Sequence, residues 1–233
     1  MSNFLPAKSA SDALLVSSST RREEVAAAGG ELAVLYARAR DTPSDINEHL
    51  PVHLQLASEC DSVVEIGVRS MVSTWGLLHG LRPGGAYTGI DLALPDARVF
   101  MLAKTLAERK GVGFRFFARN DMAIAPKELG PVDMIFIDSL HTYCHLTYEL
   151  ERFAHLAKKY LTFHDTSAPW GDMDDSEYNG NRTEYPGWFD KSKRGLWPAV
   201  CDFLENHPEW ALQERRLNNH GFTVLRRRSE QQV

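Results

Sequence analysis

The sequence predicts an α/β protein built on a doubly wound, mostly parallel sheet, with helices on both faces and an antiparallel hairpin near the C-terminus. Between residues 62 and 164, short apolar β-rich segments alternate with helical segments, which is the order of a parallel sheet covered on both faces. Segments 210–217 and 222–227 are also β-rich, and turn-forming residues join them, which predicts a hairpin. The chain has 233 residues, of which 43% are hydrophobic, enough for one large domain of this class.

The N-terminal part precedes this alternation and is expected to be helical. Ser17-Ser18-Ser19-Thr20 is typical of a helix start, and Gly29-Gly30 is expected to end that helix. A second short helix is expected at 31–40, and a third at 46–60, where apolar residues recur at helical spacing. The chain is therefore expected to consist of two parts, a helical cap at 1–45 and an α/β domain at 46–233.

The alternating part supplies five strands, and a two-stranded hairpin completes a seven-stranded sheet. The parallel strands are expected at 63–67, 86–91, 114–117, 132–138 and 160–164. Helices are expected from 73 through 78 and at 96–110, 142–158 and 196–206. The fourth strand is almost wholly apolar, as in a strand buried on both faces. The stretch 167–194 is too long for an ordinary connection and is predicted to be a functional insertion.

Composition excludes several classes of protein. The net charge is −5 and no basic stripe is present, which argues against a nucleic-acid partner. The three cysteines form no CxxC pair, which favours reduced thiols in the cytoplasm over disulfides or a zinc cage. No apolar run reaches membrane-spanning length, so neither a membrane partner nor a secreted protein is expected.

Carboxylates gather where the predicted strands end. In a doubly wound sheet, ligands bind beyond the carboxyl ends of the strands. Each of the five groups at these ends carries an acid; the acids are Glu65, Asp91, Asp121, Asp138 and Asp165. A site with this excess of negative charge suits a cation, either a metal ion or a positively charged cofactor.

From residue 46 to 227 the sequence resembles the class I S-adenosylmethionine-dependent methyltransferases. Glu65-Ile66-Gly67-Val68-Arg69-Ser70-Met71 stands where that family has its acidic, glycine-rich first loop. Asp91 matches the acid that binds both ribose hydroxyls, and Asn120-Asp121 matches the position that contacts the adenine amino group. The closing antiparallel hairpin is also a mark of the family. The resemblance implies a Rossmann-like fold and an O-methyltransferase that uses S-adenosylmethionine.

The resemblance also implies which residues bind the cofactor: Glu65, Gly67, Arg69, Ser70, Ser73, Asp91, Asn120, Asp121 and Asp138. Arg69 and Met71 stand where the family commonly has glycine, and their side chains would occupy the space of the methionine portion. An alternative therefore remains, a non-catalytic binding or interaction domain that has lost the cofactor. A nicotinamide-dinucleotide site is disfavoured because Gly67 is the one glycine of the G-x-G-x-x-G pattern that is present.

Asp138 and Asp165 end neighbouring strands of the predicted sheet, so their carboxylates are expected to converge on a divalent cation, Mg²⁺ or another. This arrangement resembles metal-dependent O-methyltransferases of the catechol and macrolide-sugar types, and His164 is a candidate third ligand. A cation there would lower the pKa of a substrate hydroxyl. His141 is the candidate general base, and its alternative role is to cap the following helix.

The acceptor is expected to be a small molecule such as a sugar, a polyol or a natural product. Trp170 and Trp188 of the insertion, with His141 and Tyr143, are the candidate residues for binding it. The insertion could equally be an ordinary surface loop or a contact in a homodimer. His145 and His155 are interpreted as surface or packing residues.

Overall fold

The computed structural model describes residues 10–175 and 185–229 and confirms the doubly wound α/β class. Its seven strands form one sheet in the order β3-β2-β1-β4-β5-β7-β6. Strands β1 to β5 pair in parallel, whereas β7 runs antiparallel between β5 and β6. The strands are β1 (Ser62–Ile66), β2 (Ala86–Asp91), β3 (Gly113–Ala118), β4 (Val132–Ile137), β5 (Ala157–His164), β6 (Trp210–Arg216) and β7 (Phe222–Arg227).

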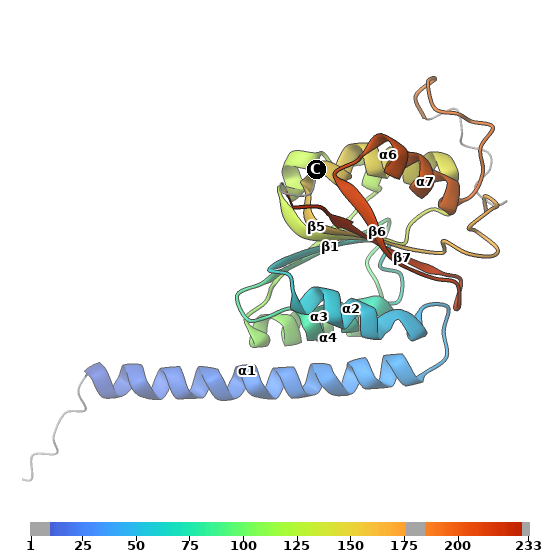
Figure 1. Ribbon diagram of the computed structural model, residues 1–233. Helices are drawn as coiled ribbons and strands as arrows, with labels where there is room; N and C mark the ends of the chain where they lie inside the picture. Colours follow the sequence, from blue (N-terminus) through green and yellow to red (C-terminus); the bar gives the residue numbers. More distant parts are fainter. Residues whose placement is uncertain (1–9, 176–184, 230–233) are drawn as a thin grey trace, which may run out of the picture.

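Helices cover both faces of the sheet (Figure 1). The α-helices are α1 (Ala10–Asp41), α2 (Leu50–Ser58), α3 (Val72–Gly80), α4 (Ala97–Lys110), α5 (Pro126–Leu129), α6 (Tyr143–Phe153) and α7 (Leu196–Asn206). Three short 3₁₀ turns join them, η1 (Asn47–His49), η2 (Asp121–Ala123) and η3 (Ala154–Leu156). One hydrophobic core lies between the sheet and α6 and α7, and a second lies between the sheet and α2, α3 and α4. This double cover explains why all six residues of β4 are buried.

Local sequence signals account for most element boundaries. Helix α4 begins after Asp96, whose side chain accepts hydrogen bonds from the backbone N–H groups of Arg98 and Val99, and it ends at Gly111 in the left-handed conformation. Helix α6 begins after Thr142, whose hydroxyl accepts from the backbone N–H of His145. This cap places the first turn of α6 directly beyond the carboxyl end of β4.

Two expected boundaries are wrong. Gly29-Gly30 does not end a helix, because α1 continues through both residues. Ala28 and Leu32 are fully buried, since α1 packs across α3 and α4, and this packing outweighs the poor helix preference of glycine (Figure 1). Helix α6 ends at Phe153 instead of residue 158, because Ala157 already pairs with Val132 of β4.

The hairpin tip folds back over the N-terminal segment that leads into η1. Asn219 and His220 have positive φ angles, as a tight turn between twisted strands requires. The Asn219 amide donates to the backbone oxygen of Ser44, and Nε2 of His49 lies 3.1 Å from the backbone oxygen of Asn218. These contacts hold the segment around Ser44 beside the carboxyl edge of the sheet.

Gly67 lies where the first loop meets the end of β4 at the carboxyl edge of the sheet. Its φ is +87°, and a Cβ at this position would lie 1.9 Å from the backbone oxygen of Asp138. We expect Gly67→Ala to lower the free energy of unfolding by more than about 3 kcal/mol, because strain at positive φ and a backbone clash add together. Urea denaturation followed by circular dichroism measures this change.

Gly84→Ala is the matched control, because Gly84 has a φ of +90° but no atom within 4 Å of the added Cβ. The control carries the conformational strain without the clash, so we expect it to cost about 1–2 kcal/mol. Equal losses in the two variants would contradict a specific contact between the first loop and the end of β4.

Within the described residues, no helix combines the length and the apolar character needed to cross a membrane.

Candidate functional site

A cavity of about 380 Å³ opens at the carboxyl ends of β1, β2, β4 and β5. Its walls come from segments that are far apart in the sequence: the segment before η1, the loop after β1, and the residues after β2, β3, β4 and β5. Eight of the nine predicted cofactor residues line it: Gly67, Arg69, Ser70, Ser73, Asp91, Asn120, Asp121 and Asp138. Asp138, His141 and Asp165 line the same cavity. The fold therefore brings the two predicted groups into one space.

Asp91 organises the first loop. Its Oδ2 accepts hydrogen bonds from the backbone N–H groups of Val68 and Arg69, at 2.8 and 2.7 Å. The other carboxylate oxygen of Asp91 accepts no hydrogen bond from the described residues, and the side chain faces the cavity. Asp91 thus fixes the loop with one oxygen and offers the other to a ligand.

Glu65 does not line the cavity but lies fully buried beneath it. Its carboxylate accepts hydrogen bonds from the hydroxyls of Ser73, Thr74 and Tyr87, and the contact with Thr74 is 2.7 Å long. Burial raises the pKa of Glu65 to about 7, against the lowering effect of these three hydroxyls. Glu65 therefore supports Ser73, which does face the cavity, instead of meeting a ligand itself.

Met71 does not enter the cavity. Its side chain is fully buried among the core residues on the α2, α3 and α4 side of the sheet. A left-handed backbone, with a φ of +66°, turns the residue at the start of α3. From the sequence, the Met71 side chain was expected in the space of the methionine portion of the cofactor. That location is wrong, because a sequence alone does not reveal the left-handed backbone at Met71.

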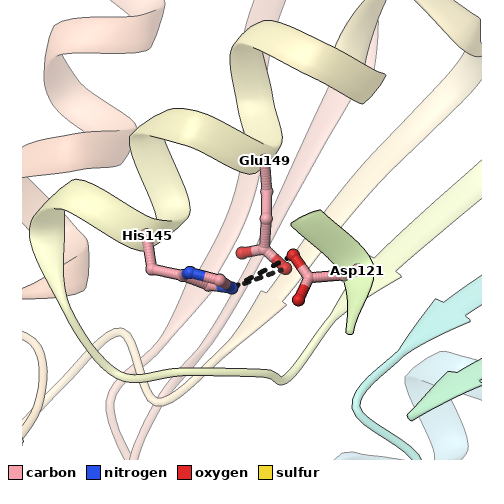
Figure 2. Close-up of side chains that lie close together, drawn as sticks. All are labelled: Asp121, His145 and Glu149. Atoms are coloured by element: carbon pink, nitrogen blue, oxygen red, sulfur yellow. Dashed lines mark ion pairs between the residues drawn. The ribbon is translucent and has the colours of Figure 1, made fainter. Parts of the chain in front are cut away.

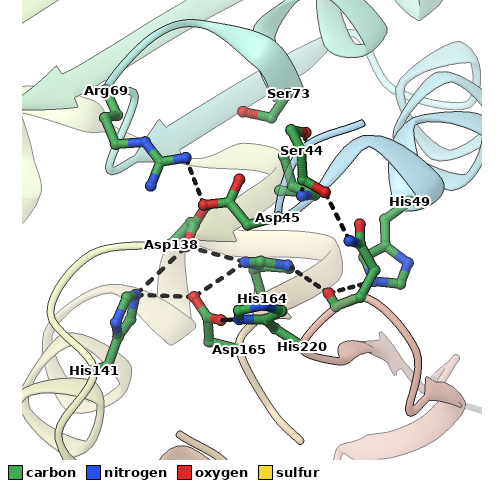
Figure 3. A network of polar contacts seen from close by, with 12 residues as sticks. Ser44, Asp45, His49, Arg69, Ser73, Asp138, His141, His164, Asp165 and His220 are labelled. Carbon is green, nitrogen blue, oxygen red and sulfur yellow. Dashed lines mark hydrogen bonds and ion pairs between the residues drawn. The ribbon is translucent and has the colours of Figure 1, made fainter. Parts of the chain in front are cut away.

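Arg69 also has a positive φ, +43°, and its side chain is 71% exposed. Its guanidinium lies 2.6 Å from Oδ2 of Asp45, which raises the pKa of Arg69 against the opposing effect of partial burial (Figure 3). This ion pair joins the first loop to the segment before η1. Arg69 therefore lines the cavity while its exposed guanidinium is paired with Asp45.

The two residues after β3 that were predicted to meet the adenine, Asn120 and Asp121, have different contacts. Asn120 accepts a hydrogen bond from the backbone N–H of Met122 and so caps η2. Asp121 is almost completely buried, and its Oδ2 lies 3.1 Å from Nε2 of His145 in α6. Both residues line the cavity at the end remote from β5.

The carboxylates of Asp138 and Asp165 converge as expected from neighbouring strand ends (Figure 3). One ligand atom each of Asp138, His141 and Asp165 lie within 4.8 Å of one another. His141 Nε2 is 2.9 Å from Oδ2 of Asp165 and 3.8 Å from Oδ1 of Asp138. The arrangement combines two carboxylates and an imidazole at the wall of the cavity.

His164 faces the same two carboxylates from β5. Its Nδ1 lies 3.1 Å from Asp165 and 3.4 Å from Asp138, and its Nε2 lies 3.0 Å from the backbone oxygen of Asn219. Since a carbonyl can only accept, Nε2 donates to it. In the protein alone, Asp138 and Asp165 raise the pKa of His164 well above its ordinary value, against the effect of burial; in the neutral ring, Nδ1 would carry the free electron pair. Carboxylate oxygens and a neutral imidazole nitrogen are ligand atoms that bind divalent cations.

Opposite charges at this cluster shift the pKa values strongly. Burial alone would lower the pKa of His141, but its contacts with Asp138 and Asp165 raise it to about 10. Burial would raise the pKa of Asp138, but the charge of His164 and the hydrogen bond from His141 hold it well below its usual range. In the protein alone, His141 is therefore a protonated imidazolium at neutral pH.

Several other proteins with solved structures are similar in fold to this chain. A protein from Corynebacterium glutamicum is 18% identical, with a TM-score of 0.56, over 86% of this chain and 92% of its own. TomG from Streptomyces achromogenes, an O-methyltransferase involved in tomaymycin synthesis and solved with SAM (S-adenosylmethionine), is 15% identical, with a TM-score of 0.53, over 87% and 90%. The O-methyltransferase from Bacillus cereus, solved with SAH (S-adenosylhomocysteine), is 15% identical, with a TM-score of 0.50, over 87% and 91%.

The chain has the class I methyltransferase fold. No model of a known protein family matches the sequence, and no curated protein matches it. At these levels of identity, the similarity establishes the fold, and the residues must supply the argument for chemistry.

Three of the four predicted acceptor residues, Tyr143, Trp170 and Trp188, lie outside the lining of the main cavity of this methyltransferase fold. Tyr143 is almost completely buried, and its hydroxyl contacts Oδ2 of Asp202 in α7 at 2.5 Å. Trp188 is 69% exposed and, like Tyr143, lines a separate hollow between α6, α7 and the insertion. Trp170 does not line the main cavity either, but it stacks on His141, which does, with 5.7 Å between the ring centres. Parts of the expected insertion, including Tyr178, lie outside the described residues.

The sequence reasoning missed several residues of this site. Asp45, Arg119, His145 and Asp175 line the main cavity. His145 was interpreted as a surface or packing residue; it is buried, as a packing residue is, and its Nε2 also lies 3.1 Å from Oδ2 of Asp121. The spacing of four between His145 and Glu149 on one helix face was the signal that could have revealed it.

We expect the free energy of unfolding to fall as pH rises from 8 to 10. The pKa of His141 is raised from 6.5 to about 10, so its stabilising effect is complete below 6.5 and is lost as pH rises through 10. One proton can account for at most about 1.4 kcal/mol per pH unit. Urea denaturation at several pH values should show a flatter dependence for His141→Gln, whereas His155→Gln, an exposed control, should follow the wild type. Equal slopes for His141→Gln and wild type would contradict the ion pairing.

Proposed function

We propose that this chain is an S-adenosylmethionine-dependent O-methyltransferase acting on a hydroxyl group of a small molecule such as a sugar, a polyol or a natural product. The observation that carries the proposal is the single cavity with Asp91 and Asp121 in one part and Asp138, His141 and Asp165 in another. Known O-methyltransferases of the same fold, solved with SAM or SAH, support it.

The cofactor is assigned to the part of the cavity formed by β1, β2 and β3. Asp91 would hold the ribose hydroxyls with its free oxygen, and Asp121 would accept from the adenine amino group. Gly67, whose close approach to the backbone of Asp138 joins the first loop to the end of β4, is assigned with Ser73 to the methionine portion. The remaining assigned contacts are Arg69, Ser70, Asn120 and Asp138, while Glu65 acts through Ser73. The excess of acid suits the positive sulfonium group.

The acceptor is assigned to the part formed by the ends of β4 and β5. Trp170, stacked on His141, provides an aromatic surface for a ring. Asp138, Asp165 and Nδ1 of His164 have the chemistry to hold a divalent cation. Such a cation, when bound, would lower the pKa of the acceptor hydroxyl and offset the negative charge that raises the pKa of His141.

The transfer is a direct displacement. The acceptor oxygen forms a bond to the methyl carbon, the bond between that carbon and sulfur breaks, and the electron pair stays on sulfur, which leaves SAH. The hydroxyl proton passes to the free ring nitrogen of neutral His141, Nδ1, while Nε2–H donates to Oδ2 of Asp165 at 2.9 Å and so orients the ring. Most of the acceleration comes from holding oxygen, methyl carbon and sulfur in line.

The alternative, a binding domain without cofactor, rested on the lack of an Asn or Asp beside Asp165 and on Met71. Its burial in the core leaves the first loop free of this side chain. Titration calorimetry with SAM and with SAH tests the proposal directly, and we expect both to bind. Release of SAH in the presence of a panel of sugars, polyols and phenols would then identify the acceptor class. Absence of binding by both at millimolar concentration would overturn the proposal.

A further inference from the structure

A second cluster of metal-ligating side chains lies behind the adenine end of the cavity (Figure 2). Asp121 comes from η2, while His145 and Glu149 are four residues apart on α6 and face it together. One ligand atom of each lies within 4.8 Å of the others. None of the three belongs to the group formed by Asp138, His141 and Asp165.

The spacing of these atoms suits an ion between them. Nε2 of His145 lies 3.1 Å from Oδ2 of Asp121 and 3.8 Å from Oε1 of Glu149. Ligand atoms about 2.0–2.1 Å from a tetrahedral zinc ion are separated by about 3.3 Å. Small side-chain adjustments would bring all three atoms onto one centre.

Glu149 supplies the observation that points to a ligand. Its side chain is completely buried, and Oε1 accepts a hydrogen bond from the Ser139 hydroxyl at 2.7 Å. Oε2 has no hydrogen-bond partner among the described residues, although Figure 2 shows the carboxylate facing His145 and Asp121. A buried carboxylate oxygen without a partner is unfavourable unless a cation or a donor satisfies it.

A contact at Nδ1 of His145 orients the ring so that Nε2 can coordinate a metal ion. Nδ1 lies 2.8 Å from the hydroxyl of Tyr185, so Nε2 is the ring atom presented to the two acids. A hydrogen bond on the far nitrogen is the usual support for a histidine that binds a metal. Two carboxylates and one neutral imidazole would match the charge of a divalent ion at this buried position.

We propose that Asp121, His145 and Glu149 form a binding site for a divalent metal ion of the zinc type, separate from the acceptor side of the cavity. One imidazole nitrogen and two carboxylate oxygens are ligands that zinc accepts in tetrahedral sites, whereas Mg²⁺ requires six oxygens. Asp121 and His145 also line the cavity, so a water molecule can reach the fourth position. The ion would hold Asp121 at the adenine end.

The test measures zinc bound per chain, with neither cofactor nor acceptor present. The background is the double variant Asp138→Asn, Asp165→Asn, which removes both carboxylates of the other cluster and with them that zinc site. After equilibrium dialysis against Zn²⁺ and elemental analysis, we expect about one zinc per chain in this background. Adding Glu149→Gln or His145→Gln should remove it.

The matched controls are Glu151→Gln and His155→Gln in the same background. Glu151 lies on the same helix and His155 in the turn that follows it, and both side chains are exposed, so each control should retain the zinc. Circular dichroism establishes that each variant is folded. In addition, Zn²⁺ should raise the melting temperature of the background and the controls but not of the Glu149→Gln variant.

Zinc retained after Glu149→Gln and His145→Gln, or no zinc in the background, would overturn the proposal. Equal zinc in every variant would mean adventitious surface binding and would also overturn it. Because the readout involves no SAM and no turnover, failure here leaves the proposed methyltransferase function unaffected, and the reverse also holds.

Discussion

Replacement of Asp91 by asparagine should weaken SAH binding by about 100-fold or more. The free oxygen of Asp91 is assigned to the ribose hydroxyls, and hydrogen bonds to a charged group are each worth about 1.5–3 kcal/mol. The substitution also weakens the acceptor of the Val68 and Arg69 N–H groups and so loosens the first loop. Titration calorimetry of SAH with wild type and variant measures the ratio.

Asp96→Asn is the control for this experiment. Asp96 follows the same strand but caps α4 and does not line the cavity, and asparagine also caps helices well. The control should bind SAH with an affinity close to that of the wild type. Similar SAH affinity for wild type and the Asp91→Asn variant would place the cofactor elsewhere and contradict the assignment of β2 to the ribose.

Asp165→Asn is the second substitution with a large expected effect. It should lower turnover and leave cofactor affinity nearly unchanged. Asp165 orients His141 and is assigned to the divalent cation, so its loss removes proton transfer and cation binding together. We expect kcat to fall by about 10²–10⁴-fold, the usual contribution of a general base. SAH affinity should change by no more than a few-fold, because Asp165 lies outside the part of the cavity assigned to the cofactor.

The matched control for turnover is Asp172→Asn. Asp172 is an exposed acid in the segment after β5 and does not line the main cavity. Turnover is measured as SAH release with the acceptor found in the screen, after circular dichroism has established that both variants are folded. Wild-type kcat in the Asp165→Asn variant would remove both assigned roles. A parallel loss of SAH affinity would instead mean that Asp165 belongs to the cofactor site.

The fold was predictable because it depends on local patterns. The apolar run at 132–138 indicated a strand buried on both faces, and β4 has all six residues buried. The turn residues between 217 and 222 indicated the hairpin that pairs β6 with β7. The continuous helix α1 was missed, because its passage through Gly29 and Gly30 depends on packing against α3 and α4.

The strand ends explain why part of the site was predictable. Parallel strands all place their carboxyl ends at one edge, so the convergence of Asp138 and Asp165 followed from the strand assignments. The location of Tyr143 and Trp188 did not follow from the strand assignments, because residues near in sequence to a site can project to another side of a helix or loop.

The sequence by itself determined the class of the fold, the order of its elements and the edge at which its acids gather, because periodicity and turn chemistry are local properties. The tertiary structure decided the rest. A positive φ at Met71 turned its side chain into the core, and the packing of α6 on the sheet brought Glu149 and His145 to Asp121. Side-chain direction and burial depend on contacts between distant segments, which no local pattern specifies.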